Sequence, residues 1–149
     1  QPLVRRLFEN YSKADQTLDI ALVQQLCYDM GIYYSHMDIK ISIKPFLHSS
    51  QNGIMDYDAF MVWWRSNNDF SALKLNDNQT LRRVEAAAKF KAYDTSLDGQ
   101  VQLSHFHFIF RDLVEMKCLS SRLEFSSVVE VLDPGDTGFI GLNDFIHWI

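Results

Sequence analysis

The chain has 149 residues, a formal net charge of −5 and 47% hydrophobic residues, with few glycines and prolines. Such a composition is typical of one compact domain or two small lobes and excludes an intrinsically disordered chain. The acidic charge argues against a nucleic-acid partner, and no apolar run approaches the roughly 20 residues that a membrane-spanning helix requires.

The two cysteines, Cys27 and Cys118, lie far apart within apolar helical patterns. We therefore predict buried, reduced thiols instead of a disulfide. Because the sequence shows no signal peptide, the expected location is the cytoplasm, including association with the cytoskeleton.

Apolar spacing predicts a mainly helical chain in which one helix-loop-helix frame occurs four times. Each of the four loops has an apolar residue at the corresponding position of this frame, and these residues are Leu18, Met55, Val101 and Ile140. The predicted helices span residues 2–11, 21–30, 35–47, 57–66, 78–93, 103–116, 120–132 and 142–149.

The first two loops, residues 12–22 and 48–59, lack the features of a calcium site. A twelve-residue calcium loop offers oxygens at positions one, three, five and seven, a glycine at position six and a chelating glutamate at position twelve. The first loop is one residue short and has Gln16 where the glycine would stand, and the second ends in Ala59. We expect neither loop to bind calcium tightly.

A polar stretch, residues 67–77, separates the first two repeats from the last two. We interpret it as a linker between an N-terminal pair of repeats, residues 1–66, and a C-terminal pair, residues 78–149. The longer spacing between Met55 and Val101 than within either pair supports this division.

The third loop, residues 94–105, comes closest to the calcium pattern. Its candidate ligands are the side chains at the first, third and fifth positions, the carbonyl at the seventh and the side chain at the ninth: Asp94, Ser96, Asp98, Gln100 and Gln102. His105 stands where the glutamate would chelate, and a neutral imidazole nitrogen is poorly matched to a hard cation.

The fourth loop, residues 133–144, offers fewer oxygens. Asp133 and Asp144 occupy its first and last positions, but Gly135 and Gly141 provide no side-chain oxygen. Asp136 stands at a position that does not ligate. This loop is therefore a weaker candidate than the third.

This order of loop residues is that of an EF-hand, and four such repeats in two pairs resemble the calmodulin superfamily, which includes calmodulin, troponin C and the myosin light chains. The resemblance covers nearly the whole chain, and it is carried by recognisable loop residues in the third repeat and part of the fourth. It implies an all-α fold of four EF-hand units in two paired lobes. Short antiparallel β bridges would join Leu18 to Met55 and Val101 to Ile140.

The resemblance implies either calcium sensing or constitutive binding of a target helix. Because the loops have lost most ligands, the first hypothesis is a largely calcium-independent adaptor, like a light chain, that binds an amphipathic helix of a larger protein. The side chains proposed to contact this partner are Met30, Met37, Met61, Trp63, Phe108 and Met116. The competing interpretation is that these side chains belong to the cores of the lobes.

Two alternatives stay open. One is a calcium sensor or buffer that uses mainly the third loop, and the other is an EF-hand module of a larger enzyme or scaffold, since the chain begins with Gln1 instead of methionine.

We predict no catalytic activity and no cofactor besides weak calcium in the third loop. His105 and His107 point to different sides of a helix and cannot share a zinc ion. The sequence also contains no phosphate-binding loop and no nucleophile elbow.

Overall fold

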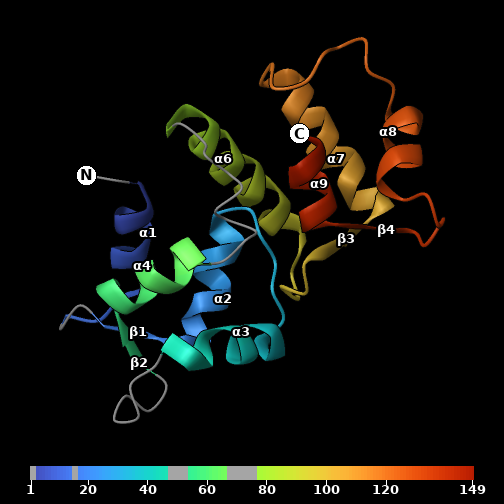
Figure 1. Ribbon diagram of the computed structural model, residues 1–149. Helices are drawn as coiled ribbons and strands as arrows, with labels where there is room; N and C mark the ends of the chain where they lie inside the picture. The colour runs from blue at the N-terminus through green and yellow to red at the C-terminus, as the bar shows by residue number, and fades with distance from the viewer. Residues whose placement is uncertain (1–2, 15–16, 47–53, 67–76) are drawn as a thin grey trace. The chain divides into compact units, whose positions relative to one another are not determined.

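The computed structural model describes residues 3–14, 17–46, 54–66 and 77–149, and within them the chain is mainly helical with two short antiparallel strand pairs (Figure 1). The chain divides into two compact units. Unit 1 contains Gln1–Met30 and Tyr34–Arg82, and unit 2 contains Gly31–Tyr33 and Arg83–Ile149. The predicted linker, residues 67–77, lies outside the described residues except for Asp77.

Unit 1 is built from short helices and one strand pair (Figure 1). In chain order, the elements described between residues 3 and 66 are α1 (Leu3–Tyr11), β1 (Thr17–Asp19), α2 (Ile20–Asp29), α3 (His36–Ile43), a 3-10 turn (Lys44–Phe46), β2 (Ile54–Asp56) and α4 (Tyr57–Ser66).

The predicted bridge between the first two loops is confirmed. Strand β1 pairs antiparallel with β2, and fully buried Leu18 lies opposite fully buried Met55. Beside this bridge, the Phe8 ring packs against the ring of Phe60 at a centroid distance of 5.4 Å. The strand pair thus joins the two helical repeats of unit 1 around one apolar core.

The first loop is shorter than the loops of unit 2. Leu18 follows Tyr11, the last residue of α1, by seven positions (18 − 11). Val101 and Ile140 each follow the last residue of the preceding helix by eight positions (101 − 93 and 140 − 132). This difference of one residue agrees with the predicted shortening.

Unit 2 repeats the same plan. The elements from α6 onward are α6 (Asp77–Tyr93), β3 (Gln100–Gln102), α7 (Leu103–Glu115), α8 (Phe125–Leu132), β4 (Phe139–Gly141) and α9 (Leu142–Trp148).

The second predicted bridge is also confirmed, because β3 pairs antiparallel with β4 and Val101 lies opposite Ile140. Two further backbone bonds connect the loops reciprocally: the N–H of Leu142 donates to the carbonyl of Gly99 at 2.7 Å, and that of Leu103 donates to Gly138 at 3.1 Å. The paired loops therefore form one structural element.

Three fully buried phenylalanines hold the helices of unit 2 together. The Phe145 ring lies 5.6 Å from that of Phe90 and 5.6 Å from that of Phe106. They come from α6, α7 and α9, so three of the four helices that flank the two loops share one core.

Two helix boundaries were predicted wrongly. The helix predicted at 120–132 begins at Phe125, because Ser120 forms a turn in which its side-chain oxygen accepts from the N–H of Arg122. The helix predicted at 35–47 ends at Ile43 and continues as a 3-10 turn, since Pro45 has no N–H to donate.

Both cysteines are free thiols, as predicted. Cys27 is buried as expected, but the predicted burial of Cys118 was wrong, because this side chain is half-buried in the turn that follows α7. Burial raises the pKa of the Cys27 thiol well above its ordinary value, so this side chain stays neutral and acts as a small apolar group. Among the described residues, no helix has both the length and the apolar character needed to cross a membrane.

Candidate functional site

The third loop is closed by its first residue. The side chain of Asp94, which is 2% exposed, accepts hydrogen bonds from the backbone N–H of Asp98 at 3.3 Å and of Gly99 at 2.9 Å. The chain reaches this conformation through positive φ at Leu97 (53°) and at Gly99 (80°). Asp94 thus folds the loop back onto the end of α6.

The fourth loop closes in the same way. The carboxylate of Asp133 accepts from the backbone N–H of Thr137 at 2.9 Å and of Gly138 at 3.0 Å. Positive φ again occurs at the third and fifth residues after the aspartate, namely Asp136 (52°) and Gly138 (84°). The two loops therefore share one backbone conformation, in which glycine supplies the left-handed turn.

In loop four, a threonine hydroxyl adds to this closure. The hydroxyl of Thr137 donates to Asp133 Oδ1 at 2.7 Å, so this carboxylate accepts three hydrogen bonds from its own loop. The Thr137 hydroxyl and N–H lower the pKa of Asp133, against a smaller opposing effect of burial, and the Gly138 N–H lowers it further. Asp133 is consequently charged in neutral solution.

Loop three places a second carboxylate beside the first. Burial opposes the ionisation of Asp98, but a hydrogen bond with Asp94, the N–H and amide of Gln100, and Ser96 together hold the pKa of Asp98 below its ordinary value. The amide Nε2 of Gln100 lies 3.5 Å from Asp98 Oδ2. The candidate ligands Asp94, Ser96 and Asp98 are therefore brought together, whereas the Gln102 side chain is exposed on β3.

The last position of each loop does not complete a cation site. His105 lies exposed in the first turn of α7, with its ring centroid 6.1 Å from that of Tyr93. Asp144 lies exposed in the first turn of α9, where a carboxylate complements the partial positive charge of a helix N-terminus. Neither residue is a glutamate that could chelate with two oxygens.

These residues do not fit a tight calcium site. Calcium in proteins takes six to eight oxygen ligands, and its affinity rises with the number of carboxylates. Loop three offers two carboxylates, and loop four engages Asp133 with three of its own donors. In residues 3–14, 17–46, 54–66 and 77–149, no three or more His, Cys, Asp or Glu side chains gather as a metal-binding group.

Asp19 and Asp56, one in each of the first two loops, act as helix caps. Asp19 Oδ1 accepts from the N–H of Ala21 at 2.9 Å at the start of α2, and Asp56 Oδ1 accepts from the N–H of Ala59 at 2.8 Å at the start of α4. Such caps satisfy backbone donors that have no partner within the helix. Four further polar side chains of these two loops, those of Asp15, His48, Ser50 and Asn52, lie outside the described residues.

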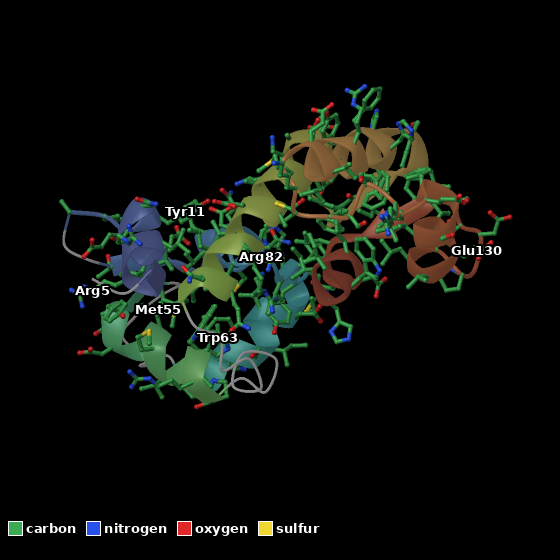
Figure 2. All side chains as sticks on the ribbon, turned by 90° about the horizontal axis from the view of Figure 1, so that it is seen from above. Arg5, Tyr11, Met55, Trp63, Arg82 and Glu130 are labelled. Carbon is green, nitrogen blue, oxygen red and sulfur yellow. The ribbon has the colours of Figure 1, made fainter. Side chains whose placement is uncertain are left out.

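The side chains predicted to contact a partner differ in exposure. Trp63 (Figure 2) is 1% exposed and donates its indole N–H to Ser42 Oγ at 2.8 Å, and Met30 is also buried. Met61 is half-buried. The exposed members of the set are Met37, Phe108 and Met116.

Sequence reasoning missed two polar contacts. The first is the contact of Thr137 with Asp133. Thr137 stands four residues after Asp133 and directly before Gly138, just as Asp98 stands four residues after Asp94 and directly before Gly99, so a comparison of the two loops could have identified this contact.

The second contact is in unit 1, where the Tyr11 hydroxyl donates to Asp29 and links the ends of α1 and α2. Burial, followed by this bond and the nearby Asp29 charge, raises the pKa of Tyr11. No local sequence pattern indicates this contact.

No protein-family model and no curated protein matches this chain.

The first prediction concerns loop closure by Asp94. Asp94→Ala leaves the buried N–H of Gly99 and its neighbour without an acceptor, so we expect a loss of about 1–3 kcal/mol in the free energy of unfolding in calcium-free buffer. Urea denaturation followed by circular dichroism measures it. Glu85→Ala, an exposed change on the same helix, is the control and should stay within about 0.5 kcal/mol of wild type. Equal stability of Asp94→Ala and wild type would contradict the role of this carboxylate.

The second prediction concerns the pH dependence of loop four. Because the pKa of Asp133 is lower in the folded chain, its charge stabilises the fold above the ordinary value of about 3.9, and this contribution is lost as pH falls through the folded value. Asp133→Asn should therefore be less stable than wild type at neutral pH, and the difference should shrink in acid. Chemical denaturation at several pH values measures the difference.

The matched control for this series is Glu130→Gln. Glu130 projects from α8, and its side chain is exposed (Figure 2). This substitution removes the same charge from the same segment without breaking loop hydrogen bonds. A stability difference between Asp133→Asn and wild type that is constant with pH would be inconsistent with a charge-based contribution.

Proposed function

We propose that this chain is an EF-hand-related adaptor in which four helix-loop-helix units form two lobes, and that it binds an amphipathic helix of a larger protein without calcium as a trigger. The observation that carries the proposal is the closure of both loops of unit 2 by their own aspartates. The backbone N–H groups at the turn of each loop, those of Asp98, Gly99, Thr137 and Gly138, therefore have acceptors within the chain.

Calcium would shift the conformational equilibrium of such loops very little. A ligand shifts a conformational equilibrium only by its difference in affinity for the two states. The described ligands are few, and the last position of loop three offers an imidazole instead of a carboxylate. Constitutive binding of a partner is the use of this scaffold that requires no metal-driven opening.

Exposed apolar side chains support partner binding. On α7, Phe108 is 40% exposed and stacks on Tyr93, with ring centroids 6.1 Å apart. The guanidinium carbon of Arg111 lies 5.1 Å from the Phe108 centroid. Met116, one residue beyond α7, is exposed as well. Aromatic, methionine and arginine side chains are those enriched where proteins bind other proteins.

A second candidate function is weak calcium sensing by loop three. It is favoured by the adjacent carboxylates of Asp94 and Asp98, of which Asp98 is exposed and has a lowered pKa. Sensing would require that calcium change the affinity for the partner, which the adaptor proposal excludes.

The experiment compares wild type with His105→Glu, which places a chelating carboxylate at the last position of loop three. Calorimetric titration of wild type with calcium should give no saturable heat in the micromolar range used by calcium sensors, whereas His105→Glu should gain measurable binding. A partner helix captured by immobilised wild type should be retained equally in excess calcium and in excess chelator.

His107→Glu is the control, because it adds the same charge to α7 two residues away from the end of the loop. It should gain no calcium binding. Micromolar calcium binding by wild type, or a partner retained only in calcium, would overturn the adaptor proposal in favour of the sensor.

A further inference from the structure

Helix α3 presents apolar side chains on two opposite faces. Its sequence alternates apolar and polar residues, and on a helix this alternation divides the apolar residues between two sides. Ile39 and Ile43 are 2% and 0% exposed and form the inner face. Met37 and Ile41, one turn apart, are 64% and 68% exposed. Packing among the described residues of unit 1 accounts for the inner pair and leaves the outer pair exposed.

The outer face belongs to a helix that is held in place. Ser35 and Asp38 form a capping box at its start: the N–H of Asp38 donates to Ser35 Oγ at 3.1 Å, and the N–H of Ser35 donates to Asp38 Oδ2 at 3.3 Å. Near its end, Ser42 Oγ accepts from the buried indole of Trp63, which belongs to α4. Met37 and Ile41 are therefore displayed on a fixed surface of unit 1.

Two lysines flank this apolar pair. Lys40 and Lys44 follow Met37 and Ile41 by three residues each, so they are surface neighbours of the pair, and both are exposed. The Asp38 carboxylate is engaged in the capping box. The face is therefore locally positive on a chain whose net charge is −5.

We propose that this outer face, formed by Met37, Lys40 and Ile41 of α3 and by Lys44 directly after it, is a docking site for a partner helix that carries apolar residues beside glutamates or aspartates. The apolar pair has the spacing of one helical turn, which suits the apolar stripe of another helix, and the lysines select acidic flanks. Two apolar side chains give too little area to hold a membrane surface, and the acidic chain as a whole opposes binding to anionic lipid. This inference rests on the proposed function and assigns a surface and a charge preference to it.

The test uses two synthetic amphipathic helices of roughly 18 residues, about five turns long, with leucines along one stripe. Glutamates flank the leucines in one peptide, and lysines flank them in the other. Fluorescence anisotropy with the full chain should show that the acidic peptide binds at least about tenfold more tightly than the basic one. This preference should weaken as salt is raised.

The variant Met37→Gln/Ile41→Gln should bind the acidic peptide about tenfold more weakly, or weaker still, and should keep the circular dichroism spectrum of wild type. Lys40→Gln/Lys44→Gln should reduce the preference between the two peptides. Val131→Gln is the matched control, because Val131 is 62% exposed on α8, far along the chain from α3, and its replacement should leave binding unchanged.

Three outcomes would overturn the inference. Equal binding of the two peptides would show that the chain has no charge preference. Unchanged binding by Met37→Gln/Ile41→Gln would show that the chain binds helices at a site other than α3. Sedimentation of the chain with phosphatidylserine vesicles, together with failure to bind the acidic peptide, would assign the face to lipid instead. The calcium and partner-capture comparison above tests the proposed function without relying on α3.

Discussion

The hydrogen bonds from loop N–H groups to Asp94 and Asp133 are the constraint on which unit 2 depends. Each carboxylate closes its loop over residues four and five positions later. This closure directs β3 and β4 into their antiparallel pair and sets the starts of α7 and α9, which bring Phe106 and Phe145 into one core. Without acceptors, the turning N–H groups would be left unsatisfied beside that core.

The same arrangement connects the fold to the proposed function. A loop whose shape depends on a metal can switch when the metal arrives, whereas a loop closed by its own carboxylate keeps one shape. The proposed adaptor accordingly offers fixed surfaces to its partners. Two of them lie in different units: the outer face of α3 and the Phe108 region of α7. A constitutive binding protein needs such permanent surfaces, whereas a sensor needs surfaces that become exposed only when the metal binds.

The sequence predicted the features that follow from periodic patterns. Helical spacing located most helices, and the apolar residue at the corresponding position of each loop identified both strand pairs, because Leu18, Met55, Val101 and Ile140 are buried and lie opposite one another in those pairs. Prediction from the sequence was wrong where a single side chain determines where a helix begins or ends. Ser120 turns the chain before α8, and Pro45 ends α3, although the apolar pattern continues past both.

Exposure was the least predictable property of the candidate binding residues. Trp63 and Met37 both fit an apolar partner surface by composition, yet Trp63 is buried against α3 and Met37 is exposed. Ile41 was not identified because its alternation with Ile39 and Ile43 gives no sign of which face packs inward. That choice depends on contacts between elements distant in the sequence, which periodicity does not encode.

Amide hydrogen exchange at Gly99 and Gly138 tests the central claim most directly, since their N–H groups donate to Asp94 and Asp133. In the presence of a calcium chelator, both amides should exchange slowly, at rates comparable to those of the β3 and β4 ladder amides, and excess calcium should change them little. Rapid exchange in chelator together with strong protection in calcium would contradict the account, because the metal would then be closing these loops in place of the aspartates.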